Sequence, residues 1–379
     1  MRSFPLASAA LLLAVCSYVP VHSQQTGAAA YLQRTRHDQN LLPERAHSGF
    51  GALLYDEKGE LVLHDGDKTW LYTTGLFERP KGKLRDWYGK WISYVREFNV
   101  RTLVSGERKL ALGLSEHDQW AVIHDVIKVS DKLFIAFYST NGGVRAAASG
   151  KPDGVFKAVR NFKIGVTDAW ENSGGEIASL ESNGAHVLIE QSDQALTLWV
   201  GYDSYHVDQT AGQLGWAQVR IDKQGQNVEL VEKSSGNPLP LLPPSYIAAR
   251  CGGNLDSSVR LGNKHAFFYY TRRNKQEIML TVALSPDPLF QRATDIVEFE
   301  PPLGDEKVIE KFESYMFAGE LHIIYENQLS SGHWGTGMRI YKIEGNFGAG
   351  SDPAAAASVP CLTSRRSSIC RNETSRSRI

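Results

Sequence analysis

Short runs of apolar residues, each ending at a cluster of Gly, Asn, Asp or Pro, follow one another along most of the chain. The clearest stretch is Trp120–Phe156, where Val122–Val129, Leu133–Ser139 and Val144–Ser149 are rich in β-branched, aromatic or small apolar residues. Polar turns separate these runs. The pattern predicts antiparallel strands joined by hairpins, which together make most of a four-stranded sheet.

Similar units recur along the chain. The segment IMLTVALSPDPLF near the end of Gly253–Phe290 parallels VRAAASGKPDGVF in the first unit, and fainter copies occupy Gly59–Gly75, Ala185–Tyr202 and Lys311–Tyr325. The period is about 55–70 residues, which is typical of a β-propeller. The sequence therefore predicts an all-β fold, a five-bladed β-propeller of four-stranded antiparallel blades, with a β-sandwich as the alternative. The apolar centres of the five copies are Leu71, Ile135, Leu198, Phe268 and Ile323.

Helical patterns are scarce. Arg85–Glu97 fits a short helix and a connection between blades equally well. The net charge is −1, with both signs interspersed, so nothing in the charge pattern indicates a nucleic-acid partner.

The two ends of the chain differ in composition from the repeats. Residues 1–23 have the pattern of a secretory signal peptide, with Arg2, an apolar run and small residues before an expected cleavage after Ser23. Residues 24–48 are polar and predict an extended lead-in, residues 49–346 hold the propeller, and residues 347–379 predict a disordered tail. We expect a secreted, extracellular monomer without a membrane partner.

The strand motifs resemble those of the five-bladed propeller glycoside hydrolases, the clan that includes glycoside hydrolase family 43 and its arabinanase, xylosidase and arabinofuranosidase relatives. In that family a blade opens with a carboxylate and closes with a strand resembling Val-Ala-x-Ser-x-x-Pro-x-Gly-Pro-Phe. Leu133–Ser139 with Val144–Phe156, and Phe267–Thr271 with Thr281–Phe290, match this scheme. The resemblance implies a carbohydrate substrate and hydrolysis of cell-wall polysaccharides or oligosaccharides such as arabinan or xylan.

Glycoside hydrolysis needs one group that protonates the leaving oxygen and another that activates water. In the family these carboxylates stand on the innermost strands and point into the axial funnel. Here the innermost strands are expected to begin near Glu60, Asp125, His186, Asp256 and Glu313, with Glu60 found by counting back from Trp70-Leu71-Tyr72. The resemblance places the general base at Glu60, with Asp56 as its alternative, the general acid at Asp256, and Asp125 in the sugar pocket, and it implies inversion of configuration. Glu60 and Glu313, each opening a hairpin, could equally be turn or cap groups.

The third blade departs from the family pattern, because no carboxylate occupies the register between Asn183 and His186. His186 and His124 hold corresponding positions in adjacent blades, so both would face the funnel, and one of them could replace the missing group as acid or base. The other substrate-binding candidates are Tyr205, His206, Arg250 and Asn254.

The sequence contains no His-Glu-x-x-His, Cys-x-x-Cys or EF-hand spacing, so it predicts no metal motif and no required cofactor. The family often holds one calcium ion on the axis, and the resemblance extends that option to this chain. The Glu in place of Asp at the base register and the incomplete third blade also fit a secreted carbohydrate-binding propeller without catalysis. A third hypothesis, an extracellular protein-interaction propeller, predicts no acidic funnel.

Overall fold

The computed structural model describes residues 32–42, 48–76, 91–113, 120–140, 142–167, 171, 179–205, 214–224, 227–233, 256–273, 277–290 and 295–344. Within these ranges the chain forms strands and turns without an α-helix. Accordingly, the described part offers no helix with the length and apolar character needed to cross a membrane.

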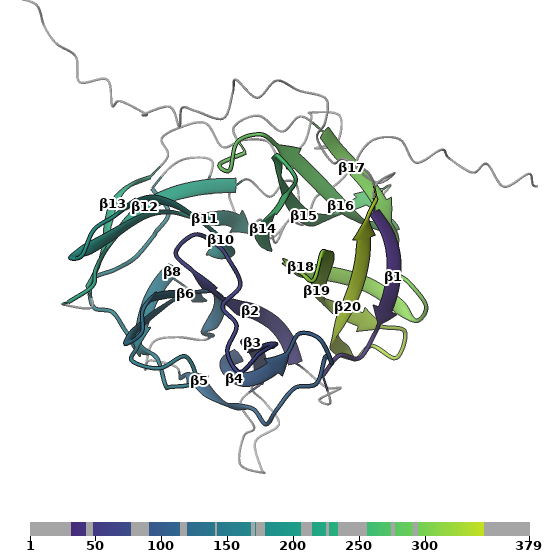
Figure 1. Ribbon diagram of the computed structural model, residues 1–379, viewed down its shortest axis with the longest axis horizontal. Helices are drawn as coiled ribbons and strands as arrows, with labels where there is room; N and C mark the ends of the chain where they lie inside the picture. Colours follow the sequence, from purple (N-terminus) through teal and green to yellow (C-terminus); the bar gives the residue numbers. More distant parts are fainter. Residues whose placement is uncertain are drawn as a thin grey trace, which may run out of the picture. The chain divides into compact units, whose positions relative to one another are not determined.

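The largest sheet has eight strands in the order β5-β4-β3-β2-β6-β7-β8-β9 (Figure 1). Its halves meet where β2 and β6 pair in parallel, with Leu54 opposite Val126. We call the half with β2–β5 sheet I and the half with β6–β9 sheet II. The strands of sheet I are β2 (Ser48–Asp56), β3 (Lys68–Leu76), β4 (Trp91–Asn99) and β5 (Lys109–Leu112). Those of sheet II are β6 (Val122–Ser130), β7 (Leu133–Thr140), β8 (Gly143–Ser149) and β9 (Lys157–Ala158).

Three further sheets have four strands each, and neighbouring strands in them are antiparallel. Sheet III contains β10 (Ser179–Gln191), β11 (Ala195–Tyr205), β12 (Leu214–Asp222) and β13 (Val228–Lys233). Sheet IV contains β14 (Asp256–Leu261), β15 (Lys264–Arg273), β16 (Glu277–Ser285) and β17 (Asp295–Glu300). Sheet V contains β18 (Glu306–Phe317), β19 (Glu320–Leu329), β20 (Trp334–Ile343) and, beside β20, the first strand β1 (Leu32–Asp38).

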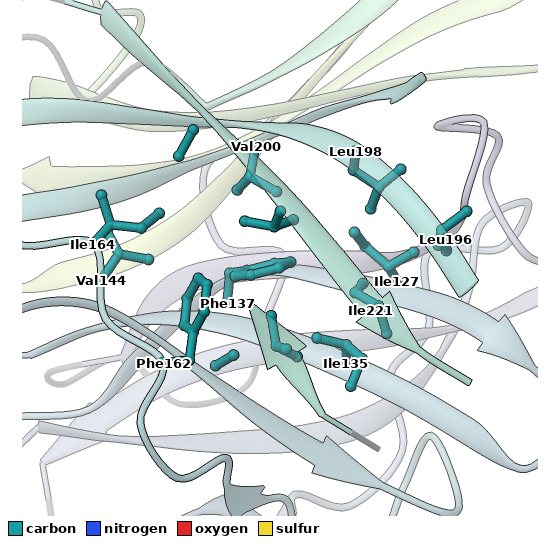
Figure 2. Close-up of a cluster of buried hydrophobic side chains, with 14 of the residues drawn as sticks. Ile127, Ile135, Phe137, Val144, Phe162, Ile164, Leu196, Leu198, Val200 and Ile221 are labelled. Atoms are coloured by element: carbon teal, nitrogen blue, oxygen red, sulfur yellow. The ribbon is translucent and has the colours of Figure 1, made fainter. Parts of the chain in front are cut away.

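The first strands of the five sheets contact one another in a closed cycle, β2 to β6, β6 to β10, β10 to β14, β14 to β18 and β18 back to β2. Five clusters of buried apolar side chains accompany this cycle, one between each pair of consecutive sheets. Figure 2 shows the cluster between sheets II and III, which includes Ile127, Ile135 and Phe137 of sheet II and Leu198 and Val200 of sheet III. Each sheet therefore buries both of its faces, which explains the nearly continuous apolar runs in the sequence.

The predicted repeat corresponds to the sheets. All five expected apolar centres lie on the second strand of a sheet, namely β3, β7, β11, β15 and β19. Both interpretations of Arg85–Glu97, a short helix and a connection between blades, are wrong from Trp91 onward, because β4 begins there and pairs with β3; residues 85–90 lie outside the described residues. β1 lies within the expected lead-in, where it forms the outer strand of sheet V.

Sheet V is joined to its neighbours by a buried polar network around Arg339, whose side chain is fully buried. Its guanidinium contacts Glu306 at 2.8 Å and Glu300 of β17 at 3.0 Å. Glu306 also accepts hydrogen bonds from Tyr325 (2.6 Å) and Asn327 (3.1 Å), and it contacts the His37 ring of β1 at 3.2 Å. Burial by itself raises the pKa of Glu306, but the charge of Arg339 and these hydrogen bonds outweigh it and lower the pKa. The network thus ties β1 to the rest of sheet V and joins β17 of sheet IV to that sheet.

Replacing Arg339 by Met should lower the free energy of unfolding by about 3–5 kcal/mol, because the buried Glu306 carboxylate then loses its guanidinium partner. Urea unfolding measures the change. The control is Lys342→Met on the same strand, which removes an exposed cation. Equal stability of the two variants would contradict this role of Arg339.

Candidate functional site

Each first strand carries a β-bulge or register irregularity. The shifts lie at Phe50/Ala52, Ile123/Asp125, Ser182/His186, Asp256/Ser258 and Glu310/Glu313. A bulge twists the strand and redirects the side chains next to it. Gly51 occupies the bulge of β2, where a Cβ atom would lie 2.7 Å from the Ile123 carbonyl oxygen. These irregular positions, together with the side chains that contact them, surround the cycle of first strands, and we call them the ring.

Asp125 and His186, from neighbouring sheets, meet in this ring. His186 Nδ1 lies 3.0 Å from Asp125 Oδ2, and Nε2 lies 2.8 Å from the carbonyl oxygen of Asp56 at the end of β2. Both partners are hydrogen-bond acceptors, so both ring nitrogens carry hydrogen and the ring is an imidazolium. Burial by itself lowers the pKa of His186, but the charge of Asp125 and the two hydrogen bonds outweigh it and raise the pKa. One side chain thereby links β10, β6 and β2.

The second oxygen of Asp125, Oδ1, is buried without a hydrogen-bond partner among the described residues. Asp125 as a whole is 1% exposed. A buried carboxylate oxygen without a partner is costly. It marks the place in the ring where a ligand hydroxyl, a water molecule or a cation would be stabilised.

Tyr55 of β2 and Glu313 of β18 form the adjoining part of the ring. The Tyr55 hydroxyl donates to the Ser314 carbonyl oxygen at 3.3 Å, and its ring lies 6.5 Å from the His186 ring. Burial raises the pKa of Tyr55, and the charge of Glu313 and a hydrogen bond with Glu313 raise it further, with a smaller contribution from the charge of Asp125. Tyr55 therefore remains a protonated donor close to both carboxylates.

His124 occupies the bulge of β6 directly before Asp125 and is buried. Burial, together with the positive charge of Lys311 in the bulge of β18, lowers the pKa of His124 to about 3. Lys311 itself lies 3.2 Å from Glu326. The ring therefore contains a neutral histidine, His124, and a charged one, His186, because only the second has a carboxylate partner.

Three of the predicted residues, Asp125, His124 and His186, are brought together at the ring. The Asp56 carboxylate instead binds the hairpin that follows β2, where its Oδ1 accepts from the Glu60 backbone N–H at 2.9 Å, and Glu60 itself lies in that hairpin. These two residues line a surface pocket of about 430 Å³ at the ends of β2, β6 and β10. The expected register of the first blade, with its innermost strand beginning near Glu60, is wrong.

The reason is the spacing in sheet I. The expected register counts back from Trp70-Leu71-Tyr72 over a short turn, whereas the hairpin between β2 and β3 includes eleven residues, from 57 to 67. The true first strand is Ser48–Asp56, and Ala52 holds the position that corresponds to Asp125. The strand contains no carboxylate before its last residue.

Several candidates lie outside the described residues. These are His206, Arg250 and Asn254, and the side chains of Tyr205 and Asp256. The backbone of Asp256 is described, and it begins β14 directly before the bulge.

Sequence reasoning missed one member of the ring, Tyr55, and placed another, Glu313, without giving it a role. Glu313 stands at the expected register of the fifth copy, but a hairpin-opening carboxylate also fits a turn or cap group. Tyr55 gave no signal at all, because it ends a Gly- and Leu-rich run that reads as core. The apolar residues that follow Glu313, namely Tyr315, Met316 and Phe317, are the feature that could have indicated its burial.

Calcium takes six to eight oxygen ligands. Among the described residues, the ring offers the carboxylates of Asp125 and Glu313, which are of the right type but too few to form such a site alone. A separate group with metal-ligand spacing, His64, Asp65 and Glu97, lies in sheet I and its hairpin. There Lys68 Nζ lies 2.9 Å from Glu97 Oε1, so the lysine ammonium group already neutralises the carboxylate that a metal ion would need.

No protein-family model matches the chain, and no curated protein sequence matches it significantly. Solved structures do. Zg3597, a family 117 glycoside hydrolase produced by the marine bacterium Zobellia galactanivorans, is 11% identical, with a TM-score of 0.51 over 83% of this chain and 92% of that chain. BT0996, in its complex with RGII, is 11% identical, with a TM-score of 0.50 over the same shares. A thermostable family-43 glycoside hydrolase is 14% identical, with a TM-score of 0.43 over 80% and 95%.

At these identities the similarity concerns the fold. The predicted resemblance to propeller glycoside hydrolases is confirmed at that level.

The pH dependence of stability should change when His124 is replaced by Gln. The folded-state pKa is about 3, below the unfolded value of about 6.5, so the unfolded state takes up the extra proton and stability falls as pH falls between these values. The variant should lack this contribution, which reduces the acid slope by up to about 1.4 kcal/mol per pH unit. Urea unfolding measures it, with the exposed His333→Gln as control. An unchanged slope in His124→Gln would contradict the buried neutral state.

Asp125→Asn should change the pH dependence of stability in the other direction, through His186. The folded-state pKa of His186 is raised, so its contribution to stability is complete below the unfolded pKa of about 6.5 and is lost as pH rises through the folded pKa. Without Asp125 the stability below about pH 6.5 should drop by about 3–5 kcal/mol, and the deficit should shrink as pH rises. Unfolding curves from about pH 5 to 9 test this, against the exposed Asp193→Asn. A deficit that does not vary with pH would exclude the ion pair.

Proposed function

We propose that this chain is a secreted five-bladed β-propeller glycoside hydrolase that cleaves glycosidic bonds in cell-wall polysaccharides or their oligosaccharides, with inversion of configuration. The observation that carries the proposal is the ring itself, in which an ionised Asp125 with an unpartnered oxygen meets titratable side chains from several sheets. Perturbed titratable groups gathered at one place are typical of catalytic sites.

The five-bladed arrangement is supported by the closed cycle of first strands and by the five apolar clusters between consecutive sheets. In this proposal sheets I and II count as two blades that share the parallel β2–β6 pair. Blade V is completed by β1, so the two ends of the described chain close the ring. A first strand from every blade then faces the common axis. The propeller glycoside hydrolases that this chain resembles hold their carboxylates there.

In the proposed mechanism Asp256 is the general acid, because β14 begins there at the bulge of sheet IV. Asp125 binds the sugar through Oδ1, while His186 holds its other oxygen, Oδ2, in place at 3.0 Å. The neutral His124 can donate or accept a hydrogen bond to a sugar hydroxyl. Glu60 is not assigned the base role, since it is exposed and lies at the opposite end of β2 from the bulge.

The substrate class rests on the resemblance and on the structures of similar fold, one of which is a complex with RGII and another a family 117 glycoside hydrolase. Secretion rests on the signal-like residues 1–23. A monomer without a nucleic-acid or membrane partner, and optional calcium on the axis, complete the proposal.

A second candidate is a carbohydrate-binding propeller without hydrolysis. It is favoured by the burial of Asp125, His186 and Glu313, each less than 10% exposed, and by Ala52 at the position where a blade I carboxylate would stand. The two candidates predict different behaviour toward the same sugars, since the second binds them and leaves them intact.

Hydrolysis of a panel of nitrophenyl glycosides and cell-wall polysaccharides tests the proposal, comparing the protein with Asp256→Asn. Removing a general acid should lower kcat about 100- to 10,000-fold while sugar binding persists. The control is Asp305→Asn, an exposed carboxylate before β18. Sugar binding without any hydrolysis would favour the binding propeller, and full activity of Asp256→Asn would remove that residue from the mechanism.

A further inference from the structure

The ring contains two described carboxylates, Asp125 on β6 and Glu313 on β18. Both strands contact β2, one from each side of the cycle. At the bulge of β2 itself the corresponding residue is Ala52, whose methyl group is fully buried. The smallest chiral side chain thus stands between two carboxylate-bearing strands, at the blade where the resemblance predicts a general base.

Tyr55 connects the two carboxylates. It follows Ala52 on β2 by three residues, its hydroxyl reaches the Glu313–Ser314 segment, and its ring lies against His186, the partner of Asp125. A phenol that hydrogen-bonds a carboxylate favours the ionised form of that carboxylate. Glu313 is only 1% exposed, so little water screens the interaction between its carboxylate and the surrounding dipoles.

We propose that Glu313 is the general base of the axial site, taking the place of the carboxylate that blade I lacks, and that Tyr55 is its positioning residue. This inference rests on the proposed glycoside hydrolysis and names a residue for the base role, since the Asp56 carboxylate accepts from backbone N–H groups of the hairpin and Glu60 is exposed.

Atoms and charge balance in this step. The Glu313 carboxylate removes a proton from a water molecule while the water oxygen forms a bond to the anomeric carbon. The bond between that carbon and the glycosidic oxygen breaks, and the Asp256 carboxyl gives its proton to the departing oxygen. The products are two sugar hydroxyl groups, a protonated Glu313 and an ionised Asp256, and solvent returns the proton from one to the other. Water is the only co-reactant.

The test compares the protein with Glu313→Gln and Glu313→Ala on the best substrate of the panel. Loss of a general base should lower kcat about 100- to 10,000-fold with little change in KM. Azide, a small anionic nucleophile that needs no base, should restore turnover of Glu313→Ala and give a glycosyl azide. A side chain with only a structural role gives no such rescue. Glu320→Gln, at the hairpin end of the same sheet, is the matched control and should retain full activity.

Tyr55→Phe tests the positioning residue. Removing the hydroxyl should raise the pKa of Glu313, so the acid limb of the kcat/KM profile should move upward by about half to one pH unit. Circular dichroism and thermal unfolding verify that each variant is folded.

The outcomes separate the two proposals. Activity in the protein, loss in Glu313→Gln and azide rescue of Glu313→Ala support the inference. Activity in the protein that survives in folded Glu313→Gln, or that azide fails to restore in folded Glu313→Ala, overturns the assignment of Glu313 and leaves the glycoside hydrolase intact. If one of the two variants fails to fold, the other carries the test, since loss of turnover in Glu313→Gln and azide rescue of Glu313→Ala each report on the base role. Absence of hydrolysis by the unmutated protein overturns both.

Discussion

The buried ion pair between Asp125 and His186 is the interaction on which the centre of this molecule depends. Three first strands meet at it, since the histidine ring contacts the carboxylate of β6 on one side and the last carbonyl of β2 on the other. A charged pair in this position is stable only when both partners are hydrogen-bonded. The pair therefore fixes the relative height of sheets I, II and III and holds one oxygen of Asp125 ready for a ligand.

The bulges explain how polar groups reach a centre that is otherwise apolar. Regular strands between packed sheets direct their side chains toward the apolar clusters, and only an irregular position can direct one elsewhere. The five first strands share this irregularity but differ in the residue that follows it, which is Ala52, Asp125, His186, Ser258 or Glu313. The scaffold is thus repeated while the chemistry differs from sheet to sheet, as expected for a site built on a fold that serves many functions.

Much of this arrangement could be predicted from the sequence, and the exceptions have physical causes. The second strands were predictable because their apolar cores bury on both faces, and Asp125 and His186 were predictable because a charge in an apolar run needs a partner. The first strand of sheet I was misplaced for two reasons. Gly51 and Ala52 have no polar side chain that would indicate the site, and the nearest carboxylates in the sequence belong to Asp56 and to the long hairpin after it. Tyr55 and the Arg339 network depend on contacts between residues far apart in the sequence, so no local pattern indicates them.

The ring of first strands is, in our proposal, a carbohydrate site. A crystal structure of the Asp256→Asn variant soaked with an arabinan or xylan oligosaccharide tests this most directly. We predict a sugar ring on the axis with a hydroxyl within hydrogen-bond distance of Asp125 Oδ1 and a water molecule next to Glu313. A sugar bound instead in the pocket beside Asp56 and Glu60, with Asp125 Oδ1 facing only protein, would contradict it.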